Sequence, residues 1–179
     1  PRYYINGSNC QLLLGEYARA LELANEGAEE AQRLGAGFSA RAMLESNAMD
    51  AALALGRDWD RVEPWTSRLI RLLEPSVFTT YLRLNVFWVL VWRGRFDEAE
   101  QYLHARGAEL DRFASIEVQI RLPLTGSRAE LAAFRGDPAR ALELASIVIE
   151  PEHRRIPVHD LRLLAIAARA AAGLRDRGV

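Results

Sequence analysis

Lysine is absent from this sequence of 179 residues, and all 23 basic residues are arginine. A phosphate-binding loop of the G-x-x-x-x-G-K type needs a lysine to reach the phosphates, so the sequence excludes such a loop. The 24 acidic residues bring the net charge to -1, which leaves no overall field to draw the chain to nucleic acid or to an anionic membrane. We therefore expect no direct contact with nucleic acid or membrane.

Cysteine and histidine are also scarce. The single cysteine, Cys10, excludes an internal disulfide and a cysteine metal cluster. The three histidines, His104, His153 and His159, have no second His or Cys at metal-ligand spacing, so we expect no metal site. His153 stands beside a pair of arginines in a segment flanked by prolines, which we interpret as a solvated loop rather than as an anion or partner contact.

Residues with the spacing of a catalytic site are missing, because candidate Ser, His and Asp residues fall on unrelated positions of the chain. The segment Gly35 to Ala40 has the form G-x-G-x-x-A of dinucleotide-binding folds. That fingerprint works directly after a strand, whereas a helix is expected here, so we interpret the segment as a turn between helices. The sequence predicts a protein that is not an enzyme and has no cofactor.

Long apolar runs are missing as well. The run Leu84 to Trp92 has nine residues, whereas a helix that spans a bilayer needs about 20. The beginning of the chain lacks the features of a secretory signal. We expect a cytoplasmic chain, and the initial Pro1 together with the abrupt end at Val179 favours a piece of a longer protein.

An internal repeat is the main feature that the sequence does contain. The string GEYARA at Gly15 to Ala20 recurs in similar form from Gly94 and from Gly136, with a weaker copy around Trp59. Alignment of residues 15, 57, 94, 136 and 173 gives spacings of 42, 37, 42 and 37 residues. Such periods are typical of stacked helical hairpins. In each unit a glycine ends the first helix, and the second helix begins about two residues later.

Local signals agree with this pattern, since apolar residues recur at helical spacing and not in alternation. Asp137-Pro138 has the form of an N-cap followed by a proline at the first helical position, and Ser127 with Glu130 fits a capping box. Prolines place longer loops at 76–79 and 151–157. The sequence predicts helices near residues 3–14, 17–34, 38–55, 59–73, 79–93, 96–109, 123–135, 138–149 and 159–174.

These features predict an all-α fold without a sheet, in the form of a right-handed α-solenoid of stacked antiparallel helical hairpins. A hairpin cannot bury its apolar face alone, so neighbouring hairpins share the core. We expect a single domain over residues 1–179. Its parts would be hairpins at 1–35, 37–75, 79–110 and 122–150, and a closing helix at 158–175.

The repeat resembles the tetratricopeptide repeat, in which an aromatic follows the turn glycine by two residues and an alanine follows three residues later. Gly15, Tyr17 and Ala20 meet this pattern, and the unit at Gly94 meets it too. The longer stretch from Gly15 to Trp59 resembles the helical-repeat region of large ATP-binding bacterial transcriptional regulators of the LuxR type (MalT-like). This resemblance implies an ATPase module before the repeats and a DNA-binding helix-turn-helix module after them.

The same resemblance implies a candidate binding site on the first helices, which line a concave groove in that family. The residues that would face the groove are Asn47, Tyr81, Leu84, Trp88, Trp92 and Glu130. Trp88 and Trp92 are four residues apart and therefore lie on one helical face. Two adjacent indoles suit a peptide, a flat ligand or a neighbouring domain, but aromatic residues at helical spacing are also typical of a buried core.

Two functions follow as hypotheses. The leading one is a non-catalytic sensor or scaffold segment of a LuxR-type ATP-binding transcriptional regulator. An inducer, a protein partner or a neighbouring domain bound in the groove would change the packing of the repeats and so control the flanking modules. The alternative is a free-standing tetratricopeptide adaptor that binds a peptide segment of a protein partner.

Overall fold

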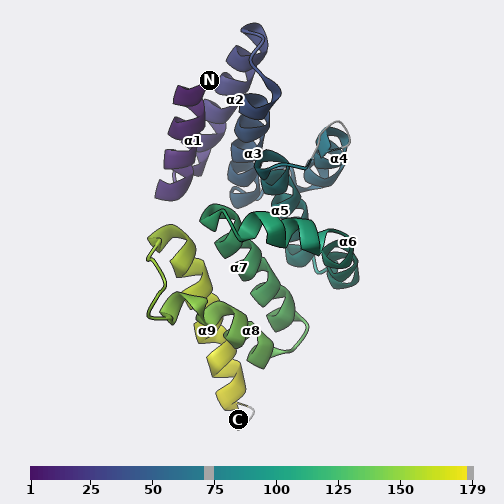
Figure 1. Ribbon diagram of the computed structural model, residues 1–179, viewed down its shortest axis with the longest axis vertical. Coiled ribbons are helices and arrows are strands. Elements are labelled where there is room, and N and C mark those ends of the chain that lie inside the picture. Colours follow the sequence, from purple (N-terminus) through teal and green to yellow (C-terminus); the bar gives the residue numbers. More distant parts are fainter. Residues whose placement is uncertain (71–74, 177–179) are drawn as a thin grey trace. The chain divides into compact units, whose positions relative to one another are not determined.

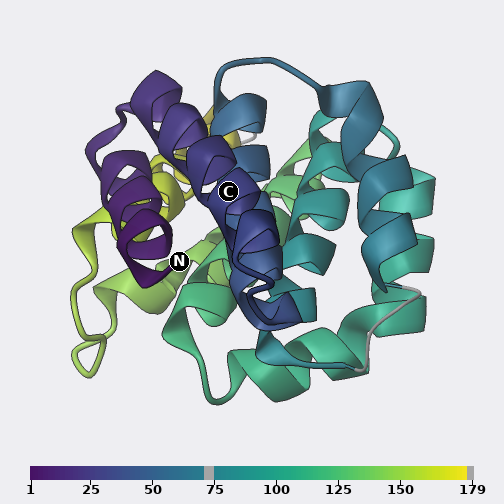
Figure 2. The ribbon, with the colours of Figure 1, turned by 90° about the horizontal axis from the view of Figure 1, so that it is seen from above.

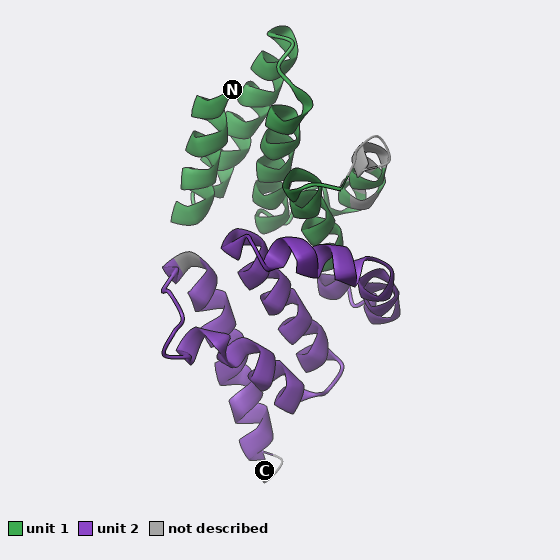
Figure 3. Cartoon of the chain, viewed as in Figure 1, with its two compact units in different colours: residues 1–89 green, residues 90–179 purple. Residues whose placement is uncertain are grey.

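The computed structural model describes residues 1–70 and 75–176, and within these residues it contains helices and no strand. This confirms the predicted all-α class. The chain divides into two compact units, residues 1–89 and 90–179, and the boundary falls within one helix (Figure 3). The helices (Figure 1) are α1 (Arg2–Leu14), α2 (Tyr17–Arg33), α3 (Phe38–Ala54), α4 (Trp59–Ile70), α5 (Val77–Trp92), α6 (Phe96–Ala114), α7 (Val118–Phe134), α8 (Pro138–Ala145), the short 3-10 helix η1 (Ser146–Ile149) and α9 (Pro157–Asp176).

Left-handed glycines lie at the ends of α1, α3, α5 and α7. Gly15, Gly56, Gly94 and Gly136 have φ angles of 79°, 71°, 71° and 82°, a region in which any side chain would be strained. The next helix begins within three residues of each of them. The predicted helix, glycine and helix order is therefore confirmed at four turns. Gly173, the fifth position of the predicted repeat, lies inside α9 instead of at a turn.

In the first unit α1 and α2 lie side by side, and α3 packs against both (Figures 1 and 2). The close approach of these helices depends on Gly27 of α2. A β-carbon at this position would lie 2.7 Å from Cδ2 of Leu44 in α3 and would overlap Tyr4 of α1. Only a glycine lets the three backbones approach one another at this point.

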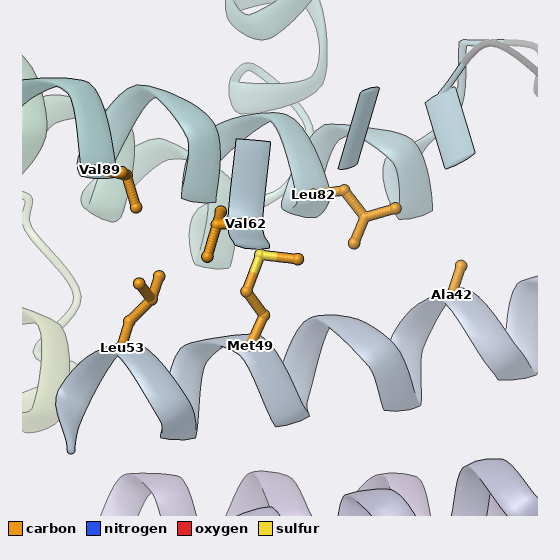
Figure 4. Close-up of a cluster of buried hydrophobic side chains, with 6 residues drawn as sticks. All are labelled: Ala42, Met49, Leu53, Val62, Leu82 and Val89. Atoms are coloured by element: carbon orange, nitrogen blue, oxygen red, sulfur yellow. The ribbon is translucent and has the colours of Figure 1, made fainter. Parts of the chain in front are cut away.

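The core of the first unit lies between α3, α4 and α5. Side chains of α3 point toward side chains of α4 and α5, and the six buried members are Ala42, Met49, Leu53, Val62, Leu82 and Val89 (Figure 4). Burial of one aliphatic side chain contributes about 1.5–3 kcal/mol relative to exposure. This cluster is therefore a main source of stability in the first unit.

The core of the second unit lies between α7, α8, η1 and α9. In this unit α8 contacts both α7 and α9, and α7 also contacts α9. The six buried side chains of this cluster are Leu122, Ala129, Ala145, Val148, Leu163 and Ile166. Three of the helices thus share one core, as expected when a single hairpin cannot bury its own apolar face.

The start of α7 differs from the prediction. This helix begins at Val118 rather than near residue 123, and the carboxylate of Glu117 accepts a hydrogen bond from the backbone N–H of Gln119 at 3.1 Å. Ser127 lies inside the helix, so the predicted capping box with Glu130 is wrong. Pro123 is the sixth residue of α7, where it removes one backbone hydrogen bond without ending the helix.

Two further helix starts test the local signals. The predicted loop at 76–79 is wrong, because α5 begins at Val77 and Thr79 belongs to its first turn. There Ser76 N donates to Thr79 Oγ1 at 2.9 Å and Thr79 N donates to Ser76 Oγ at 3.3 Å, which caps the helix reciprocally.

The predicted Asp137 N-cap of α8 is confirmed, since its Oδ1 accepts from Arg140 N at 2.9 Å. The predicted end of the fourth helix at residue 73 lies outside the described residues.

Candidate protein-binding surface

The predicted groove residues divide between the two units. The first unit contains Asn47, Tyr81, Leu84 and Trp88, and the second contains Trp92 and Glu130. Asn47 and Leu84 are buried. Asn47 Nδ2 donates to Ile5 O at 3.1 Å and to Ser8 Oγ at 2.9 Å. This side chain therefore joins α3 to α1 instead of presenting its amide to solvent.

Trp88 is partly buried against the core of the first unit. It packs against the buried cluster of α3, α4 and α5, and its ring centre lies 6.1 Å from that of Trp59. Trp59 Nε1 in turn donates to Leu53 O at 3.2 Å. Tyr81, seven residues earlier on α5, is half-buried. The surroundings of Trp88 are thus those of a packing residue.

Trp92, one helical turn further along α5, has a different environment. It is 46% exposed, and its Nε1 donates to Glu130 Oε2 at 2.9 Å. Glu130 of α7 is only 2% exposed and also accepts from the guanidinium of Arg162 in α9, whose Nε lies 3.3 Å from Oε1. Donors from α5 and α9 therefore share one buried carboxylate, and this hydrogen bond fixes the orientation of the indole.

Three aromatic rings meet where α5 and α7 end; we name Trp92, Phe96 and Phe134 the aromatic patch. Trp92 meets Phe134 edge to face with ring centres 6.2 Å apart, and Phe134 stacks on Phe96 at 5.8 Å. The guanidinium carbon of Arg135 lies 5.8 Å from the centre of the Phe96 ring. Phe134 is 49% exposed. Two contacting aromatic side chains thus keep about half of their surface in water.

Ion pairs surround the aromatic patch. Arg135 pairs with Asp97 and, at 3.0 Å, with Glu100, while Arg95 pairs with Glu98 at 2.5 Å. The carboxylate side chains are 83%, 55% and 53% exposed, against 38% and 34% for the two arginines. Such exposed pairs contribute little to stability. Their effect is on the surface charge, because three carboxylates pair with only two arginines and are the more exposed members of the network.

The buried acid of the second unit, Glu130, has a partly buried counterpart in the first. Asp50 of α3 lies six residues before Gly56, as Glu130 lies six residues before Gly136. Burial raises the pKa of Asp50 to about 7, and the nearby amide of Asn85 in α5 offsets part of this rise. Ionisation of Asp50 is therefore costly, since the carboxylate exchanges water for one neutral amide.

The segment before α9 differs from the prediction of a solvated loop. The side chains of His153 and Asp160 are buried, with His153 Nε2 2.8 Å from Asp160 Oδ1, and Ile156 N donates to Asp160 Oδ2 at 2.9 Å. Arg155 Nη1 donates to Val148 O at 2.6 Å. Burial alone would raise the pKa of Asp160, but the hydrogen bonds from His153 and Ile156 lower it below its usual value. These contacts attach the segment to the start of α9, although its polar sequence predicted a solvated loop.

Phe134 and Arg162 belong to this surface but lie outside the predicted set of site residues. Phe134 could have been found from the repeat, because it lies two residues before Gly136 just as Trp92 lies two residues before Gly94. Arg162 follows Glu130 by 32 residues. No local pattern joins residues so far apart, and only the packing of α9 on α7 brings them together.

Comparison with known proteins finds no matching family model, curated protein or solved structure. Among residues 1–70 and 75–176, no group of three or more His, Cys, Asp or Glu side chains is placed to hold a metal ion. The described helices also include none with the length and apolar character to cross a membrane. Function must therefore be inferred from the surface that the chain itself presents.

Proposed function

We propose that this chain is a non-catalytic helical-repeat segment that binds a protein partner through the aromatic patch. The exposure of Trp92 and Phe134 supports this proposal most directly, because about half of each side chain remains in water although the rings touch. Large exposed apolar surfaces mark interaction sites on monomeric proteins. Tryptophan is also enriched among the few residues that dominate binding energy in protein interfaces.

The aromatic patch is organised before any partner arrives. The indole of Trp92 is held by its hydrogen bond to Glu130, and Phe134 is held between Trp92 and Phe96. Side chains that are already fixed lose little conformational entropy when a partner covers them. The patch can therefore supply binding free energy without a rearrangement of the helices.

We further propose that the hairpins form a tetratricopeptide-like right-handed solenoid within a cytoplasmic LuxR-type regulator. The four turns at left-handed glycines and the resemblance of residues 15–59 support this placement. The partner at the aromatic patch would then be a separate protein, or the flanking ATPase or DNA-binding module of the same regulator. Determination of the reading frame on both sides of the sequence tests the placement. An upstream phosphate-loop module and a downstream helix-turn-helix support it, whereas start and stop codons at the two ends leave the free-standing peptide adaptor.

Selection from a phage-displayed library of random peptides tests the protein-binding function. We expect peptides that bind the unmodified chain and are lost when the Trp92→Ala variant is used for counter-selection. Trp92→Ala should fold, because the side chain is half-exposed and lies outside both buried clusters. Retained helical circular dichroism checks this point.

Tyr3→Ala is the matched control, since Tyr3 is an exposed aromatic of α1, far along the chain from the aromatic patch. Peptides selected on the unmodified chain should bind Tyr3→Ala equally well. Failure to enrich any peptide that depends on Trp92 would contradict the proposed function. Enrichment of peptides that depend on Tyr3 instead would assign binding to a different surface.

A further inference from the structure

The charges around the aromatic patch restrict the kind of partner that it can accept. The side chains of Asp97, Glu98 and Glu100 are exposed in larger fraction than those of Arg95 and Arg135, with which they pair. A partner that covers the rings will therefore meet carboxylates first. An acidic segment would be repelled, and an uncharged segment would cover carboxylates without compensating them.

The structure already contains an example of the contact that a cationic group makes here. Arg135 places its guanidinium over the ring of Phe96 while it pairs with Asp97 and Glu100. Aromatic rings attract cations to their faces through the ring quadrupole, and the indole of tryptophan does so most strongly. Trp92 and Phe134 provide half-exposed ring surface beside Phe96, within the same network.

We propose that the partner segment is basic, and that one of its arginine or lysine side chains stacks on the exposed rings of Trp92 and Phe134 while carboxylates of α6 pair with it. This inference rests on the proposed protein-binding function and narrows the partner to a cationic polypeptide segment. The rings supply apolar contact for the aliphatic part of the side chain. Asp97, Glu98 and Glu100 supply the charge that a guanidinium or ammonium group requires.

Titration of the ¹⁵N-labelled full chain with short synthetic peptides tests the inference. The probe is a peptide of arginine and glycine, and its matched controls carry citrulline or glutamate in place of arginine. The reporter is the indole N–H signal of Trp92, assigned by its loss in Trp92→Phe. We expect the arginine peptide to shift this signal and to bind about tenfold more tightly than the citrulline peptide, with an affinity that falls as salt is added. The glutamate peptide should leave the signal unchanged.

A charge variant separates the basic-partner inference from a general preference for apolar peptides. Asp97→Asn combined with Glu100→Gln removes two exposed carboxylates, and we expect it to weaken the arginine peptide about tenfold. Glu22→Gln combined with Glu26→Gln is the matched control, because these carboxylates are similarly exposed and both pair with Arg19 in the first unit. The control should leave the affinity unchanged.

The outcomes distinguish the two proposals. Equal binding of the arginine and citrulline peptides, or no effect of the charge variant, would overturn the basic partner. If library peptides still bound in a manner that depends on Trp92, the protein-binding function would stand without it. If neither the arginine peptide nor any library peptide bound, both proposals would fail.

Discussion

Both units contain an acidic residue at the same distance before a turn glycine, but the two acids have different partners. Asp50 in the first unit and Glu130 in the second each lie six residues before a left-handed glycine, Gly56 and Gly136. Glu130 receives the guanidinium of Arg162 and the indole N–H of Trp92. Asp50 has the neutral amide of Asn85, and burial raises its pKa to about 7.

This comparison shows that residues at the same position before a turn glycine can be buried to different degrees, and that the neighbouring helix determines what a buried polar group costs. Trp88 extends the comparison, because it lies six residues before Gly94 and fills the same position with an apolar ring. The large apolar surface of the Trp88 ring gains from burial, an ion-paired acid has its partners, and Asp50 has only part of what a carboxylate needs. The three residues should therefore respond differently to substitution.

The largest effect is expected for Trp88→Ala. Removal of a ring that packs against the core of the first unit should lower the free energy of unfolding by about 4 kcal/mol. Trp92→Ala, one turn away on the same helix, should cost about 1 kcal/mol, because half of that side chain is already exposed and one hydrogen bond is lost. Urea unfolding followed by circular dichroism measures both. Equal costs would mean that the two indoles do not differ in burial as described.

Glu130→Ala should have the next largest effect, a loss of about 3 kcal/mol, because it leaves the partly buried guanidinium of Arg162 without its carboxylate. The matched variants are Arg162→Ala and the double variant, which complete a double-mutant cycle. We expect the double variant to cost less than the sum of the single ones. Additive costs would show that Glu130 and Arg162 do not interact in solution, and the fixed indole of Trp92 would then need another explanation.

The sequence was sufficient to predict the order of helices and turns but not the contacts between helices. Glycine at the end of a first helix is a local requirement of backbone geometry, so Gly15, Gly56, Gly94 and Gly136 marked four turns correctly. Gly173 has the same spacing, yet α9 continues through it. A glycine is compatible with a turn without causing one.

The candidate surface was harder to predict, and Ser127 with Glu130 illustrates why. Two polar residues three apart form a capping box at a helix start, but they also share one face inside a helix. In α7 they lie on the face toward Arg162, whose Nη2 is 3.5 Å from Ser127 Oγ. The local pattern is identical in both cases, and only the packing of a distant helix distinguishes them. The two tryptophans of α5 were ambiguous for the same reason. Helical spacing placed Trp88 and Trp92 on one face, but it could not show which of the two rings a neighbouring helix covers.

The most selective effect is expected for Asp50→Asn, which should stabilise the protein. Asp50 has a folded-state pKa near 7 against an ordinary value of 3.8, so the folded state binds more protons than the unfolded state between these values. The stability of the unmodified chain therefore falls, through this group, as the pH rises from about 4 to about 7. Asparagine removes that loss. A pKa of about 7 against 3.8 corresponds to about 4 kcal/mol, and the partial exposure of the Asp50 side chain reduces the expected gain to about 2 kcal/mol near pH 8, with almost none near pH 4.

Urea unfolding of both proteins across this pH range isolates the contribution of Asp50, because other titrating groups are common to both. The pKa of His159 is lowered by burial and that of Asp160 by its hydrogen bonds, so both make the protein more stable as the pH rises. Their contributions have the opposite sign to that of Asp50 and cancel in the difference between the two proteins. A difference that does not change with pH would mean that the Asp50 carboxylate is solvated or paired with a cation in solution. The acids at the equivalent positions of the two units would then be compensated alike.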